Sequence, residues 1–88
     1  MNEQEVLRDV AKMARKRYGL KHKPRSTNIL YLDNYTVVII PSKSGNTPKS
    51  VGVAKRNPMD PYSPEIGLRL AYSRALRSLA GAEASTTP

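Results

Sequence analysis

The sequence predicts an α+β fold made of a helix, three antiparallel strands and a second helix, in the order α-β-β-β-α. Three observations support this: apolar residues at helical spacing near the N-terminus, three short strand-like runs between positions 27 and 55, and a second helical pattern after a proline-rich turn. Eighty-eight residues allow one small core. We therefore expect a single domain over residues 1–81, with both helices packed on one face of a three-stranded sheet, and a disordered tail over residues 82–88.

The first helix is predicted over residues 3–18. Asn2 stands three residues before Glu5, which is the spacing of a capping box, and Gly19 suits a left-handed helix stop. At about 100° per residue the apolar side chains gather on one side, which we expect to face the core: Val6, Leu7, Val10, Met13, Ala14 and Tyr18. A basic linker follows over residues 21–26.

Two strands, residues 27–32 and 35–40, are predicted to form a hairpin. An Asp-Asn pair separates them, and both residue types tolerate the positive φ of a two-residue turn. This turn places Leu30 opposite Val37. Both faces of the hairpin are then apolar, although one apolar face would suffice to cover a core.

A third strand is predicted over residues 50–55, after a mobile basic loop over residues 42–49. One face of this strand carries only small residues, so we expect another element to pack closely upon it. These small residues are Ser50, Gly52 and Ala54.

The second helix is predicted to begin at Ser63, because a serine N-cap is followed by a proline and an acid in the first turn. We expect Gly81 to end it. Its core stripe contains Leu68, Tyr72, Ala75, Leu76 and Leu79. Ile66 and Leu70 lie off this stripe, which leaves two alternatives: burial in a homodimer or larger homo-oligomer, or plain exposure at the surface.

The residue types that carry most catalysis and metal binding are scarce. The chain has no cysteine and one histidine, His22, and its acids Asp33, Asp60 and Glu65 fall at turns or at a helix start, where local capping accounts for them. We expect no enzyme, no metal and no cofactor. No apolar run is long enough to span a membrane and the first residues do not resemble a signal peptide, so we expect a cytoplasmic protein.

The charge is strongly positive: fifteen Lys and Arg against seven Asp and Glu give +8. Seven of these cations lie within residues 12–25, where there is no acid. Such an excess predicts sequence-tolerant binding of nucleic acid, DNA or RNA, through phosphates. The predicted surface contains Arg8, Lys12, Arg15, Lys16, Lys21, Lys23 and Arg25, with Lys43, Lys49, Lys55 and Arg56 in a secondary role.

Two alternatives stand beside nucleic-acid binding. The basic helix face can be an ordinary solvated face, partly neutralised by pairs such as Asp9 with Lys12. Alternatively, the protein binds or inhibits a host protein through an apolar sheet or helix surface. The five aromatic residues are all tyrosines, and packing explains them better than base stacking does, with Tyr18 and Tyr72 expected in the core.

The segment over residues 51–67, which contains Lys55-Arg56-Asn57-Pro58 and Ser63-Pro64-Glu65, is followed by Leu70-Ala71 and Arg74-Ala75-Leu76. This pattern resembles a strand-turn-helix signature of small phage-encoded proteins and of an uncharacterised actinobacterial family with a fold like the double-stranded-RNA-binding domain (dsRBD-like). The α-β-β-β-α order is also similar to that domain. The resemblance implies a small α/β domain of phage or prophage origin. Of the regions with which a dsRBD contacts RNA, only the basic face of the first helix is present here.

Overall fold

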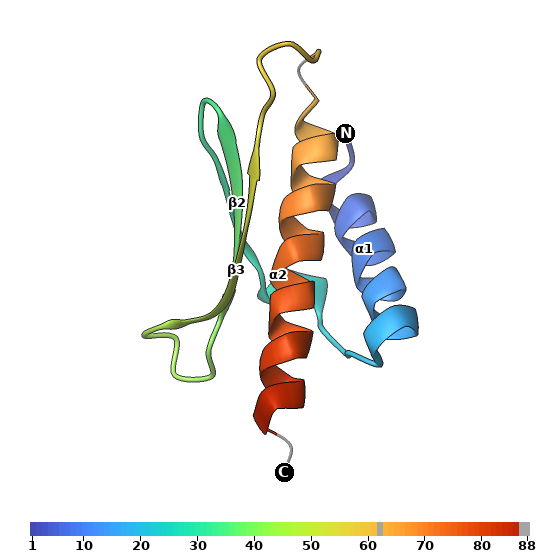
Figure 1. The fold of residues 1–88 in the computed structure, drawn as a ribbon, viewed down its shortest axis with the longest axis vertical. Helices are drawn as coiled ribbons and strands as arrows, with labels where there is room; N and C mark the ends of the chain where they lie inside the picture. The colour runs from blue at the N-terminus through green and yellow to red at the C-terminus, as the bar shows by residue number, and fades with distance from the viewer. Residues whose placement is uncertain (62, 87–88) are drawn as a thin grey trace.

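The computed structural model describes residues 1–61 and 63–86, and its element order confirms the α-β-β-β-α prediction (Figure 1). A short 3₁₀ helix, η1, lies within the basic linker. The elements are α1 (Glu3–Tyr18), η1 (Pro24–Ser26), β1 (Asn28–Tyr31), β2 (Tyr35–Pro41), β3 (Pro48–Lys55) and α2 (Pro64–Thr86).

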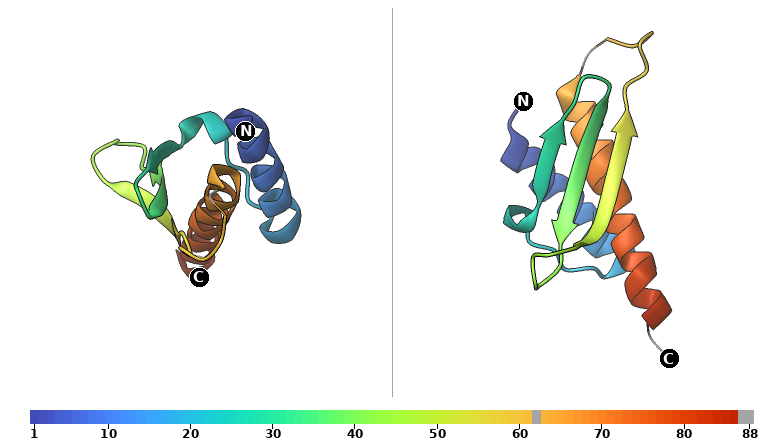
Figure 2. Two further views of the ribbon diagram at one scale, coloured as in Figure 1. Left: turned by 90° about the horizontal axis from the view of Figure 1, so that it is seen from above. Right: turned by 90° about the vertical axis from the view of Figure 1, so that its left-hand side faces the viewer.

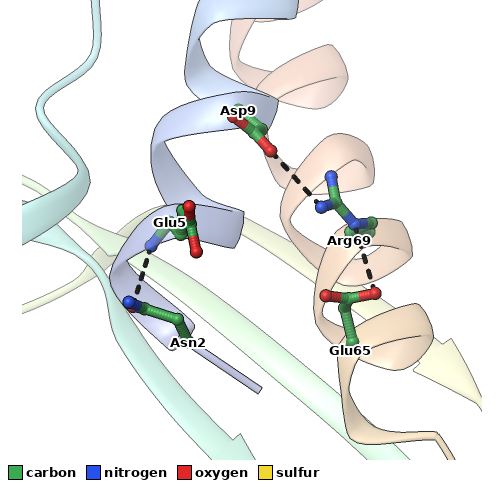
Figure 3. Close-up of polar contacts among 5 residues, drawn as sticks. All are labelled: Asn2, Glu5, Asp9, Glu65 and Arg69. Atoms are coloured by element: carbon green, nitrogen blue, oxygen red, sulfur yellow. Dashed lines mark hydrogen bonds and ion pairs between the residues drawn. The ribbon is translucent and has the colours of Figure 1, made fainter.

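The ends of α1 are where the sequence predicts them. The Asn2 side chain accepts a hydrogen bond from the Glu5 backbone N–H at 3.2 Å (Figure 3), and Gly19 takes the left-handed conformation with φ 67°. The Gly19 N–H donates to the Arg15 carbonyl, which satisfies a carbonyl at the last turn. Both caps depend on the chemistry of the capping residue and of its near neighbours, so the sequence predicts them.

The three strands form one antiparallel sheet in the order β1-β2-β3, and Leu30 pairs with Val37 as predicted. The turn differs from the prediction, because no described residue other than glycine has a positive φ. The hairpin closes through the Leu32 N–H, which donates to the Tyr35 carbonyl at 2.8 Å. In addition, the Asn34 carbonyl accepts the Arg56 N–H at 2.7 Å, which ties the turn to the end of β3.

Both helices lie on one side of the sheet, but they form two successive layers. Helix α2 packs directly on β2 and β3, whereas α1 packs on α2 and has little contact with the strands (Figures 1 and 2). No helix of the described part of the chain covers the opposite face of the sheet (Figure 2). Along this outer face Leu30, Val51 and Val53 are each more than 40% exposed.

The core lies on two sides of α2, between α2 and the sheet and between α2 and α1. Its predicted stripe is buried throughout, and Tyr72 is fully buried. Helix α1 contributes a narrower stripe than predicted, namely Val6, Leu7, Val10 and Ala14. Met13 is 65% exposed and Tyr18 40% exposed, so the prediction that both face the core is wrong. A helix that packs against one other helix buries a narrow stripe, and these two residues lie at its margins.

The small face of β3 lets α2 approach the sheet closely, as predicted. A Cβ atom at Gly52 would lie 1.8 Å from the Ala71 carbonyl oxygen and 2.5 Å from the Ala75 backbone nitrogen. The Ser50 hydroxyl donates to the Ala75 carbonyl, and the Arg74 guanidinium donates to the Val53 carbonyl at 2.7 Å. These contacts fix the position of α2 along the strand.

Two predicted boundaries are wrong. Helix α2 continues through Gly81 to Thr86, because Gly81 keeps a helical rather than a left-handed backbone and a single glycine costs a helix only about 1 kcal/mol. Strand β3 begins at Pro48, so part of the segment expected to be a mobile loop pairs with the end of β2. Residues 87 and 88 of the expected tail lie outside the described residues.

Candidate nucleic-acid interface

All eleven predicted cations are exposed, and five of them line one groove. The groove has a volume of about 390 Å³ and lies between α1 and the segment that follows it. We call it the basic groove. Its walls contain Arg8, Lys12, Arg15, Lys21 and Lys23, together with Ala11, Leu20, His22 and Pro24.

Local structure explains why these five cations meet. Arg8, Lys12 and Arg15 are four and three residues apart, so they lie on one face of α1. Gly19 then turns the chain out of the helix, and the buried Leu20 anchors it to the core. Residues 21–24 therefore form the second wall of the groove, which brings two lysines of the linker opposite the helix.

The remaining predicted cations lie elsewhere, so the structure divides the set. Lys16 lines a different hollow, on the flank of α1 that carries Met13 and faces Ser73 of α2. Arg25 lies in η1 and Lys43 in the β2–β3 loop. Lys49 is the second residue of β3 and its charge acts on His22, while Lys55 ends β3 and Arg56 follows it.

The far end of β3 lines a hollow of about 340 Å³ between the hairpin turn and the start of α2. Lys55 and Arg56 line it, but so do Asp33 and Asp60. Its charge is therefore mixed, and apolar side chains such as Leu32 and Ile66 form much of the remaining wall. This hollow does not extend the basic groove.

Asp9 of α1 and Glu65 of α2 both contact Arg69 and do not line the basic groove. Asp9 accepts from the Arg69 guanidinium of α2 at 3.4 Å, and Arg69 also lies 4.0 Å from Glu65 (Figure 3). Asp9 thus bridges the two helices instead of neutralising Lys12. Among the described residues no carboxylate lies within ion-pair distance of a groove cation. The positive charge of the groove is therefore not compensated within the described part of the chain.

His22 forms part of the groove wall and also reaches the core. Its Nδ1 lies 2.7 Å from the Tyr72 hydroxyl, and the two rings meet edge to face. Its Nε2 is buried and has no hydrogen-bond partner. Burial raises the pKa of Tyr72, so the phenol stays protonated and we assign it as the donor to Nδ1. In this assignment Nε2 carries the hydrogen of the neutral ring.

The sequence does not indicate that His22 and Tyr72 are in contact, because fifty residues separate them. The spacing of apolar residues that predicts contacts within a helix or strand does not predict a contact between a linker and a distant helix. A lone histidine in a basic linker is an ordinary surface residue. The nearby signal is Leu20, an apolar residue that draws the linker toward the core. Only the packing of α1 on α2 brings the imidazole to the phenol.

Stability should depend on pH through His22. Burial lowers the pKa of the imidazole below 6.5, and the positive charge of Lys49 lowers it further. The unfolded chain then binds a proton more readily than the folded chain, so the contribution of His22 is complete above pH 6.5 and is lost as the pH falls below that value. We expect urea denaturation to give a lower free energy of unfolding at pH 5.5 than at pH 7.5. The variant His22→Asn should flatten this dependence, and a flat profile for the parent protein would contradict the argument.

Comparison with known proteins places the fold within a family. The model of the Rv2632c-like family matches residues 35–84, which contain β2, β3 and most of α2. The match includes the close contact of Gly52 with Ala71, whereas the basic groove is formed by residues 8–24 and lies outside it. No curated protein and no solved structure matches the chain significantly. Neither described helix combines the length and apolar character that a membrane crossing needs. Since the matched segment covers more than half of the chain, this protein belongs to the Rv2632c-like family.

Proposed function

We propose that the protein binds nucleic acid through its phosphates at the basic groove. One observation carries the proposal: five cations line a single concave surface, and no described carboxylate pairs with them. Phosphates fit such a surface because Lys and Arg side chains neutralise them irrespective of sequence. Apart from His22, the described residues that line the groove include no aromatic side chain on which a base could stack, which favours sequence-tolerant binding.

Other parts of the proposal follow from the sequence. The protein acts as a binding module and not as an enzyme, in the cytoplasm, and it derives from a phage or prophage. The family match over residues 35–84 supports none of these points directly. DNA and RNA are both candidates, because a phosphate surface does not distinguish between them.

The test is the salt dependence of binding. Fluorescence anisotropy with labelled duplex DNA, single-stranded DNA and duplex RNA would give dissociation constants at 50 and 200 mM salt. Five phosphate contacts predict a slope of about −4.5 in log K against log salt for duplex DNA, or a roughly 500-fold loss of affinity over this range. Binding that is independent of salt, or no binding to any of the three probes, would overturn the proposal.

The exposed outer face of the sheet favours a second candidate, in which the protein binds a host protein through this surface. Leu30 of β1 and Val53 of β3 flank Val37 of β2 there, Val51 lies two residues from Val53, and these three flanking side chains are more than 40% exposed. Under this alternative Val53→Lys would abolish binding of a partner in nuclease-treated extract, and variants of the basic groove would leave it unchanged. Sizing over a range of concentrations would separate a host partner from a second copy of this chain.

A further inference from the structure

Among the described residues that line the basic groove, His22 is the one whose side chain has an ordinary pKa between 5 and 8. We infer that binding of a polyanion in the groove is coupled to uptake of a proton by His22, so that the complex tightens as the pH falls from 7.5 to 5.5. The inference rests on the proposed function and assigns a regulatory residue to the same site. Nothing in the family match bears on it, since the match begins at residue 35.

Among the described residues, the charged groups that line the groove beside the imidazole or act on it come from three elements and are all positive. Helix α1 contributes Arg8, Lys12 and Arg15, the linker contributes Lys21 and Lys23, and β3 contributes the charge of Lys49. Tyr72 of α2 packs against the ring and is neutral. In the free protein the imidazolium therefore has no described counter-ion, and the neutral ring is favoured.

A phosphate in the groove reverses this balance. The groove is only about 390 Å³ in volume, so a bound anion lies within a few ångströms of the ring as well as of the cations. Because Nε2 is closed off from solvent, we expect the effect to act through the electrostatic field and not through a direct bond to that atom. The contact with Tyr72 survives protonation, since a phenol oxygen can accept from Nδ1–H as well as donate to Nδ1.

Proton and polyanion must then favour each other reciprocally. If the anion makes protonation of His22 easier, protonation of His22 strengthens anion binding by the same factor. A rise of about one unit in the pKa of His22 corresponds to a gain of up to about tenfold in affinity below that pKa. No other described side chain has an ordinary pKa in this range.

The experiment uses the fact that the chain has a single histidine. The Cε1–H resonance of His22 can be followed by NMR from pH 4.5 to 8, alone and with a saturating 16-base-pair DNA duplex that lacks 5′-phosphates. We expect the pKa of His22 to rise by about one unit with the duplex, and the dissociation constant to fall by up to about tenfold as the pH drops below the pKa of His22 in the free protein. The duplex has no group of its own that titrates in this window.

The variant His22→Asn is the control, because its amide oxygen can still accept from Tyr72 but does not titrate. It should bind the duplex with little change between pH 7.5 and 5.5. A duplex that binds without raising the pKa of His22 overturns the inference and leaves the proposed function standing. A duplex that does not bind at all overturns both. If His22→Asn fails to fold, the NMR titration of His22 in the parent protein, with and without the duplex, still tests the inference.

Discussion

Replacing Gly52 by alanine is expected to lower the free energy of unfolding by about 3 kcal/mol or more. The new Cβ would lie 1.8 Å from the Ala71 carbonyl oxygen, and neither atom can move unless the backbone that carries it moves as well. Relief requires α2 to move away from β3, which opens the core on that side and breaks the bond from Ser50 to the Ala75 carbonyl. Overpacking of a core usually costs 1–3 kcal/mol, and a backbone clash belongs at or beyond the upper end of that range.

Gly81→Ala is the matched control for this variant. Nothing lies within 4 Å of a Cβ at this position, and the residue is in the interior of α2. The same chemical change should therefore stabilise the protein by up to about 1 kcal/mol. Urea denaturation followed by circular dichroism measures the free energy of unfolding of both variants. Our account of the β3–α2 contact is wrong if Gly52→Ala unfolds within about 1 kcal/mol of the parent protein.

The triple variant Lys12→Gln, Arg15→Gln, Lys21→Gln is expected to bind duplex DNA roughly 100-fold more weakly at 50 mM salt. It removes cations from both walls of the basic groove, two from α1 and one from the linker. Each lost phosphate contact should also reduce the slope of log K against log salt by about 0.9, so the slope should fall by nearly three. The side chains are exposed, so the fold and the thermal midpoint should change little.

A second triple variant, Lys16→Gln, Lys43→Gln, Lys55→Gln, separates the groove from the overall charge. It lowers the net charge of +8 by the same three units, but none of its positions lines the groove. Lys16 is the most informative of these controls, because it belongs to α1, like Lys12 and Arg15, but lines a different hollow on the other flank of the helix. We expect a loss of less than about fivefold. Equal losses for the two triples would show that the polyanion senses the diffuse charge and not the groove.

The sequence was most informative where the controlling interactions are local. Asn2 and Gly19 mark the ends of α1 through their own capping chemistry, and the short turn sets the pairing of Leu30 with Val37. The order of the layers was not visible, because nothing local says that α1 packs on α2 and not on the strands. Met13 was misplaced for that reason.

The candidate site was predicted in part. The cluster of cations near residues 8–25 was evident from the count of charges, and all of its members are exposed. Which of them face one another depends on how the linker leaves the helix, so Lys16 could not be separated from Lys12 by sequence alone. The contact of His22 with Tyr72 depends on tertiary packing across fifty residues.

The layered arrangement has a consequence for motion. Helix α1 is held chiefly by α2, through its buried stripe and the Asp9–Arg69 pair, and the Tyr31 hydroxyl on Glu3 ties it to β1, so we expect that α1 can be released while the sheet and α2 remain assembled. Its amide protons should exchange with deuterium faster than those of β2 and the middle of α2. A nucleic-acid backbone that contacts both the α1 wall and the linker wall of the groove would hold α1 in place. Protection of the amide protons against exchange should then rise first between residues 8 and 15.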